Sequence, residues 1–90
     1  MSFEYDPDKS ASNLAKHGID FEAVQALWDD EFRLEIPART RGEARYALIG
    51  RIGDRHWTVI FTRRGDRLRL ISARRARKEE VALYETHGLR

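Results

Sequence analysis

The sequence contains no cysteine, only two prolines and no long run of apolar residues. Without cysteine the chain can form neither a disulfide nor a thiolate zinc site, which favours a reducing compartment. No apolar run approaches the length that spans a membrane, and the first residues lack the basic-then-apolar order of a signal peptide. These absences predict a cytoplasmic protein that works without a membrane.

Charge is distributed unevenly along the 90 residues, a length that predicts a single domain over residues 1–90. Residues 1–38 carry three bases and nine acids, whereas residues 39–90 carry fourteen bases and six acids. The first part therefore has a net charge of −6 and the second a net charge of +8. This polarity predicts a basic working surface, and hence a polyanionic partner, on the second part.

Hydrophobic spacing predicts an α+β fold. Apolar residues at helical spacing, with suitable capping residues, predict two short helices joined around Gly18 and one helix near the end, at residues 7–17, 20–28 and 76–87. Alternation predicts a short edge strand and four further strands, at residues 3–5, 32–36, 46–50, 56–62 and 67–72. The expected architecture is a small antiparallel sheet of about four strands with an N-terminal helical hairpin and a C-terminal helix.

The most distinctive segment is residues 63–78, in which arginine stands at almost every position that is not apolar. Arginine is always charged and binds phosphate oxygens bidentately, so the segment predicts a phosphate-binding surface. The alternative is a solvated strand whose arginines pair with carboxylates. Alternation along the predicted strand at residues 67–72 and just beyond it separates the side chains into two faces. One face carries Arg67, Arg69, Ile71 and Ala73, and the opposite face carries Leu68, Leu70 and Ser72. Arg64 and Arg74 are expected to flank the arginine-bearing face.

Glu43 and Arg45 form a second candidate group. Two residues apart on a predicted strand, they project to the same face, where Glu43 can orient Arg45 or act as a base. The alternative is an ordinary surface ion pair, which contributes under about 1 kcal/mol.

Lys16 and His17 end the first predicted helix. Histidine titrates near neutrality, so His17 is a candidate general acid or base for RNA cleavage. The alternative is a histidine that caps or packs at the helix end. His56 and His87 are weaker candidates, and the three histidines are not arranged as metal ligands. Tyr84 is either a core residue or a hydroxyl that reaches the arginine-bearing face.

Parts of the sequence resemble the BrnT family, small bacterial toxins of type II toxin–antitoxin systems. The resemblance is carried by Asn13–Phe21, Gly42–Arg45 and Phe61–Ala76, and by Glu80 and Tyr84. It implies a RelE-like fold and a ribonuclease activity that inhibits translation. It also implies a BrnA-type antitoxin with a ribbon-helix-helix domain, and binding of operator DNA only through the toxin–antitoxin complex.

Positions that recur in the family are matched here by His17, Glu43, Arg45, Arg64, Arg69, Arg74, Glu80 and Tyr84. We expect a metal-independent endoribonuclease without a cofactor, in which the 2′-hydroxyl of the RNA attacks the adjacent phosphate. Arg64, Arg69 and Arg74 would hold that phosphate. His17 or Glu43 would move the proton, and Glu43 would also be able to orient Arg45. Further substrate-binding positions are expected at Lys16, Arg67, Arg75 and Tyr84.

The sequence departs from the family pattern at two places. Tyr-Thr-Glu-Arg is common where this chain has residues 61–64, so Phe61 replaces a phenol and Arg63 replaces a carboxylate. Threonine is common where Arg77 stands, and its absence predicts the loss of a capping box with Glu80, at a cost of about 1 kcal/mol. The change at Arg63 supports a second hypothesis, a catalytically inactive, arginine-rich binding module for antitoxin or nucleic acid.

Overall fold

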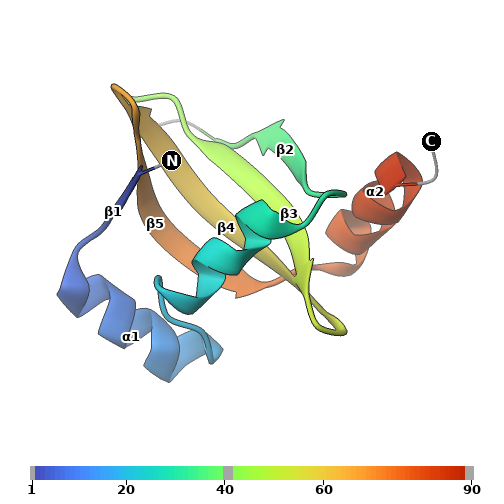
Figure 1. Cartoon of the computed structure of the whole chain (residues 1–90), viewed down its shortest axis with the longest axis horizontal. Coiled ribbons are helices and arrows are strands. Elements are labelled where there is room, and N and C mark those ends of the chain that lie inside the picture. Colours follow the sequence, from blue (N-terminus) through green and yellow to red (C-terminus); the bar gives the residue numbers. More distant parts are fainter. Residues whose placement is uncertain (1, 40–41, 89–90) are drawn as a thin grey trace.

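The computed structural model describes residues 2–39 and 42–88 (Figure 1). A five-stranded sheet in the order β1-β5-β4-β3-β2 forms its centre, with α1 and η1 on one face and α2 against the other. The elements are β1 (Ser2–Glu4), α1 (Pro7–His17), η1 (Ala23–Asp29), β2 (Leu34–Pro37), β3 (Tyr46–Ile52), β4 (Arg55–Arg64), β5 (Arg67–Arg75) and α2 (Lys78–Gly88). No helix in the described ranges is long and apolar enough to cross a membrane.

The α+β class is confirmed, but the sheet is mixed and has five strands instead of about four antiparallel ones. β2 to β5 form the predicted antiparallel meander. β1 adds a fifth strand parallel to β5, with Phe3 opposite Leu68 and Glu4 opposite Arg69. Glu4 and Arg69 are 65 residues apart in the sequence, so no local pattern indicates their pairing.

The predicted helical hairpin is wrong in its second half. α1 ends as expected at Gly18, which has a φ of 81° and donates its N–H to the Leu14 carbonyl at 2.9 Å. The segment that follows forms η1, a 3₁₀-helix of seven residues, instead of an α-helix. Its buried residues Val24 and Leu27 continue a spacing of three that starts at Phe21, just before the helix. That spacing matches the three residues per turn of a 3₁₀-helix, so these side chains all face the sheet.

The apolar core lies between the sheet and the layer formed by α1 and η1. Its buried members are Ile19, Phe21, Val24, Leu27, Leu48, Trp57, Val59, Phe61, Leu68, Leu70 and Ala73. Phe61 is fully buried at the centre of β4, and the Trp28 ring meets its ring edge-on with centroids 5.3 Å apart. The core thus occupies one face of β4 and β5 and leaves their opposite face available for polar side chains.

A β-bulge in β5 reverses the alternation of its side chains. Ile60 lies opposite Ser72 but Phe61 lies opposite Leu70, so Ile71 is an extra residue. The predicted grouping of Arg69 with Ile71 and Ala73, and of Leu70 with Ser72, is therefore wrong. Ala73 is buried in the core beside Leu70, whereas Ser72 and Arg74 share the side of Arg69. We call this side, opposite α1 and η1, the arginine face; it carries Thr58, Ile60, Thr62, Arg69, Ser72 and Arg74.

Asn13 of α1 takes the place of a strand neighbour along the outer edge of β5. Its side-chain amide donates to the Ala73 carbonyl at 2.9 Å, and its oxygen accepts from the Ala73 N–H at 3.1 Å. The same amide donates to the Ile19 carbonyl at 2.8 Å. Because β1 pairs with β5 only as far as Arg69, these bonds satisfy an edge that no strand covers. They also hold the C-terminal end of α1 beside the bulge.

Candidate functional site

Three rows of side chains cross from β4 to β5 on the arginine face. Thr62 lies opposite Arg69, Ile60 opposite Ser72, and Thr58 opposite Arg74. We name these the Arg69 row, the Ser72 row and the Arg74 row. Rows two residues apart on a strand are separated by roughly 7 Å, so the first and third rows lie about 13 Å apart.

Three predicted site residues besides Arg69 gather at the Arg69 row. Thr62 Oγ1 donates to the Ala44 carbonyl at 2.6 Å, which holds the segment before β3 against this end of β4. Arg64 lies 3.8 Å from Glu43 in a loose and exposed ion pair. Tyr46 pairs with the core residue Phe61, so alternation puts the preceding Arg45 on the arginine face, next to Thr62.

Arg45 contains a buried polar atom that none of the described residues satisfies. Its Nε has no hydrogen-bond partner among the described residues. A buried donor without a partner costs about 1–3 kcal/mol, which makes it an unfavourable feature of the chain by itself. An anion that reached this N–H would remove the cost and meet a charged guanidinium in a partly desolvated place. Arg45 is therefore a strong candidate for anion binding.

Arg69 is tied to β1 by a carboxylate that sequence patterns did not single out. Its Nη1 donates to Glu4 Oε2 at 3.0 Å, and Arg67 lies 4.0 Å from the other oxygen of Glu4. The side chain of Arg69 nevertheless keeps 32 % of its surface exposed. Glu4 thus orients Arg69 beside Thr62 without covering it. Its role depends on the parallel pairing of β1 with β5.

Arg74 is held by a bidentate ion pair with Glu80 of α2. Arg74 donates to the two Glu80 oxygens at 2.7 and 2.9 Å, and Thr58 Oγ1 donates to Oε1 at 3.0 Å. The hydrogen bonds from Arg74 lower the pKa of Glu80 to about 2, against the opposing effect of burial. Glu80 also accepts from the Arg77 N–H at 2.7 Å. One half of the capping box therefore persists, although the sequence predicted its loss.

Lys16 and His17 line a small hollow between α1 and the bulge of β5. The wall on the β5 side is formed by Ile71 and Ser72. The structure thus brings His17 to the outer edge of the Ser72 row, between Arg69 and Arg74. Both Lys16 and His17 are exposed, so each is accessible from solvent.

Arg75 and Tyr84 lie outside the three rows. The Arg75 guanidinium lies 5.5 Å from the centroid of the Trp57 ring, on the core-facing side of the sheet end. Tyr84 is buried, and its hydroxyl donates to Asp30 Oδ2 at 2.6 Å. Burial and this hydrogen bond raise the pKa of Tyr84 to about 12. The hydroxyl therefore stays protonated and attaches α2 to the end of η1.

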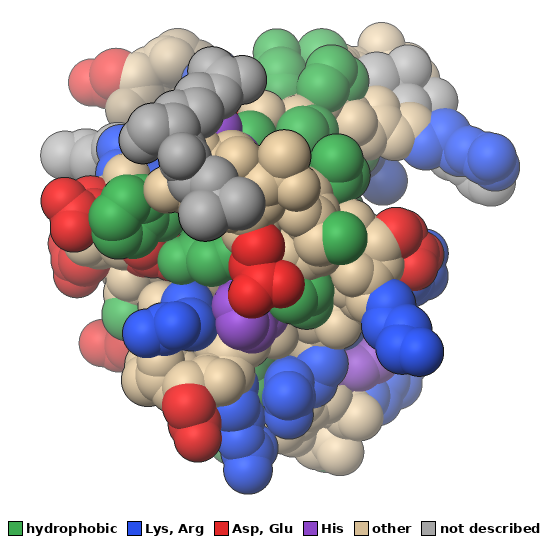
Figure 2. Space-filling model, turned by 90° about the vertical axis from the view of Figure 1, so that its right-hand side faces the viewer, with side chains coloured by type: hydrophobic (Ala, Val, Ile, Leu, Met, Phe, Trp, Pro, Cys, Tyr) green, Lys and Arg blue, Asp and Glu red, His purple; other side chains and the backbone are tan. Residues whose placement is uncertain are grey.

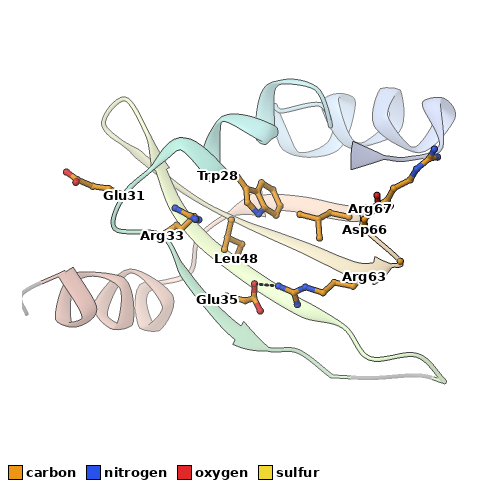
Figure 3. Close-up of a pocket in the computed structure, with 10 residues that line it drawn as sticks. Trp28, Glu31, Arg33, Glu35, Leu48, Arg63, Asp66 and Arg67 are labelled. Carbon is orange, nitrogen blue, oxygen red and sulfur yellow. Dashed lines mark hydrogen bonds and ion pairs between the residues drawn. The ribbon is translucent and has the colours of Figure 1, made fainter. Parts of the chain in front are cut away.

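The departures at Phe61 and Arg63 lie on the face opposite the Arg69 row. Phe61 is fully buried in the core. Arg63 donates to Glu35 at 2.7 Å and stacks over the Tyr46 ring at 4.5 Å. Figure 3 shows Arg63 joined to Glu35 in a groove that Trp28 also lines. A carboxylate at position 63 would lie in this groove, so the substitution leaves the arginine face unchanged.

The match to a known family covers all three rows. A family model described as the ribonuclease toxin BrnT of type II toxin–antitoxin systems matches residues 5–80. The chain belongs to this family. No curated protein matches it. The matched range of this BrnT protein includes every predicted catalytic position, from His17 to Arg74, and family membership makes the chain a toxin of the ribonuclease type with an antitoxin partner.

The described ranges of this BrnT protein contain no cluster of three or more histidine, cysteine, aspartate or glutamate side chains that could hold a metal ion. The chemistry available at the arginine face is that of guanidinium groups, hydroxyls, the carboxylates of Glu4, Glu43 and Glu80, and the imidazole of His17 at its outer edge. Such groups can hold and neutralise a phosphate and can transfer a proton.

Replacing Arg63 by glutamine is expected to change RNA cleavage by less than twofold. The side chain lies on the opposite face from the Arg69 row, and its exposed ion pair with Glu35 contributes at most about 1 kcal/mol. Cleavage of a short RNA by the purified variant measures the effect. Arg64→Gln is the matched comparison, because the neighbouring arginine is on the arginine face and its loss is expected to slow cleavage clearly. Equal losses in both variants would contradict the assignment of faces.

Proposed function

We propose that this BrnT protein is an endoribonuclease whose reaction takes place at the Arg69 row. The observation that carries the proposal is the buried Nε of Arg45 beside Thr62, which has no hydrogen-bond partner in residues 2–39 and 42–88. Arg45 and Arg69 flank Thr62 from the two neighbouring strands, and Arg64 lies at the hairpin next to them. Adjacent strands are about 4.8 Å apart, so the side chains of Arg45 and Arg69 can reach one phosphate from two sides.

In the proposed reaction the 2′-hydroxyl of the RNA attacks the adjacent phosphorus, and the 5′-oxygen of the next nucleotide leaves. The guanidinium groups stabilise the charge that develops on the phosphate oxygens. Glu43 lies on the β3 side of the Arg69 row, and His17 lies on the outer side of β5. Attack and departure in line require a base and an acid on opposite sides of the phosphorus, and we propose Glu43 and His17 for these two roles.

Arg74 and the predicted substrate-binding cations are placed to bind phosphates that flank the cleavage site in the RNA, rather than the phosphate that reacts. Arg74 lies about 13 Å from the Arg69 row and is held by Glu80. Lys16 and Arg67 border the rows on the α1 side and the hairpin side. We propose that these cations bind the RNA on either side of the reactive phosphate, that Arg75 binds further along, and that Tyr84 positions α2.

We further propose that the antitoxin is of the BrnA type and neutralises the toxin by covering the arginine face. Membership in a type II toxin–antitoxin family supports a protein antitoxin. An acidic segment of such a partner would compete for the same cations as the RNA. Binding of operator DNA would then belong to the ribbon-helix-helix domain of the complex, and the site of action would be the cytoplasm, where the RNA is.

A second candidate function is that of a binding module without catalysis. It is favoured by one observation: Arg64, Arg69 and Arg74 each already face a carboxylate of the same chain, from Glu43, Glu4 and Glu80. An arginine face arranged around carboxylates suits capture of an acidic protein segment. The two candidates differ in turnover, because an enzyme cleaves RNA in excess over itself.

The test is inducible expression of the wild type and of Arg69→Ala in bacteria, with growth and total RNA followed together. The expected result is growth arrest with RNA breakdown for the wild type only. Arg69 is partly exposed and outside the core, so the variant should stay folded, as circular dichroism of the purified protein will check. Normal growth and intact RNA with soluble wild type would support the binding module. Equal toxicity of Arg69→Ala would remove Arg69 from the mechanism.

A further inference from the structure

A second group of cations lies at the end of the sheet farthest from the Arg69 row. We call it the basic end; its members are Arg51, Arg55, Arg75, Arg77 and Lys78. The β3–β4 hairpin and the junction of β5 with α2 meet there, since Arg51 lies opposite His56, and the Ala76 N–H donates to the His56 carbonyl at 3.0 Å. In Figure 2, Lys and Arg side chains gather over the lower part of the view, below a region of hydrophobic side chains.

The cations of the basic end differ from those of the arginine face in their pairing. Ion pairs within residues 2–39 and 42–88 involve Arg63, Arg64, Arg67, Arg69 and Arg74. No side-chain cation of the basic end forms an ion pair within those ranges, and all five side chains are exposed. The carboxylates of Asp30 and Glu80 accept only from the backbone N–H groups of Arg51 and Arg77. Arg51 shares a hollow with Asp29, Asp30, Glu31 and Glu85, which balance its charge. The acids close in sequence to the other four cations are Asp54 in the hairpin turn and Glu79 in α2, so an excess of positive charge remains there.

The position of two of these cations adds to the unfavourable electrostatics. Arg77 and Lys78 stand at the N-terminal end of α2, where the helix dipole already contributes positive potential. Cations at this end oppose the dipole, and anions are favoured there. Like charges held together in this way are unfavourable for the free chain and become favourable when a polyanion binds.

We propose that the basic end binds backbone phosphates of the RNA strand beyond the reactive phosphate, so that it continues the track of the arginine face. This inference rests on the proposed function, which makes RNA the substrate. The Arg74 row borders the basic end directly. Arg74 lies opposite Thr58, and the next residue, Arg75 of the basic end, lies opposite Trp57. From Thr62 to Arg55 the track follows β4 for roughly 23 Å.

The shape of the basic end fits a single strand better than a duplex. Alternation puts Arg51 on the arginine face, whereas Arg55 and Arg75 are on the core-facing side of the sheet end. The cations therefore turn around the end of the sheet. A flexible single strand can follow that turn, whereas a duplex of this length behaves as a stiff rod.

The test measures binding of a fluorescent 2′-O-methyl RNA oligonucleotide by anisotropy at several salt concentrations. This RNA has no free 2′-hydroxyl, so binding is read without cleavage. Arg55→Gln/Arg77→Gln is expected to weaken binding about tenfold at low salt and to lower the slope of log K against log salt by about 1.4, or about 0.7 for each lost phosphate contact. The control Arg33→Gln/Arg63→Gln removes two arginines from the groove on the opposite face and is expected to change binding less than twofold.

Equal weakening by the two double variants would overturn the proposal, because net charge alone would then explain the effect. An unchanged salt slope in Arg55→Gln/Arg77→Gln would overturn it as well, and so would tighter binding of duplex DNA than of the RNA by the wild type. The proposed function fails in a different experiment, by the absence of cleavage of ordinary RNA. A loss of cleavage therefore does not obscure the binding comparison.

Discussion

Replacing Arg45 by methionine is expected to lower RNA cleavage by about a hundredfold and to leave the chain as stable as before, or more stable. Methionine keeps an unbranched apolar stem and removes the buried Nε, which lacks a partner among the described residues. That donor costs free energy in the folded chain, so its removal should not destabilise the protein. If the phosphate of the RNA supplies the missing partner, the arginine is favourable only in the complex.

Two measurements together decide the role of Arg45. Cleavage of a short RNA gives kcat/KM, and urea unfolding gives the free energy of unfolding of the same preparation. Arg45→Lys keeps a charge but loses the planar fork and the Nε, so most of the cleavage should still be lost. Arg33→Met is the control on the opposite face and should change neither quantity. Unchanged cleavage with a loss of more than about 2 kcal/mol in Arg45→Met would assign Arg45 to the fold instead.

Capping and turn residues in the sequence predicted correctly the parts of the fold that depend on residues close in sequence. Asp6 accepts from the Asp8 N–H at 2.9 Å, as expected of a residue that caps the start of α1. Gly18 ends α1, and Gly65 allows the β4–β5 turn with a φ of 60°. The pairing of Arg74 with Glu80 was also foreseeable, since a helix N-terminus follows an arginine-rich strand. These features depend on residues close in sequence.

Apart from the 3₁₀ geometry of η1, which is local, the main failures concern relations between distant segments. The bulge at Ile71 depends on how β5 aligns with β4, and one extra residue moved Ser72 and Ala73 to the faces opposite to those predicted. The parallel pairing of β1, and with it the carboxylate of Glu4 beside Arg69, joins residues at both ends of the chain. Alternation along β4 would also have put Arg63 and Arg64 on opposite faces, which would have shown that the family's carboxylate is not on the arginine face.

Asn13 is the residue whose structural role sequence reasoning missed most clearly. It stands inside α1, where asparagine is unfavourable because its side chain competes for backbone hydrogen bonds. Only 6 % of its surface is exposed, and its amide serves Ile19 and both backbone groups of Ala73. A polar residue at an unfavourable helical position is a signal of such a role, but the partner cannot be read from the sequence.

Asn13→Ala is expected to lower the free energy of unfolding by about 3 kcal/mol or more, because it leaves three buried backbone groups without partners. For a domain of this size that corresponds to a fall in Tm of roughly 15 °C. Urea and thermal unfolding measure the effect. The control Ser12→Ala changes the adjacent exposed residue and should stay within about 0.5 kcal/mol of the wild type.

Asn13→Asp sharpens the same prediction, because it keeps the shape and the acceptor for the Ala73 N–H but loses both donated bonds. It also sets a carboxylate against the carbonyls of Ile19 and Ala73, so it should be at least as unstable as Asn13→Ala. A loss below about 1 kcal/mol in both variants would mean that water replaces the side chain, and that Asn13 does not fix α1 to β5. If the large loss of stability is observed, the Asn13 amide fixes the position of His17 beside Ser72. RNA cleavage by Asn13→Ala and Asn13→Asp should then decrease together with their stability.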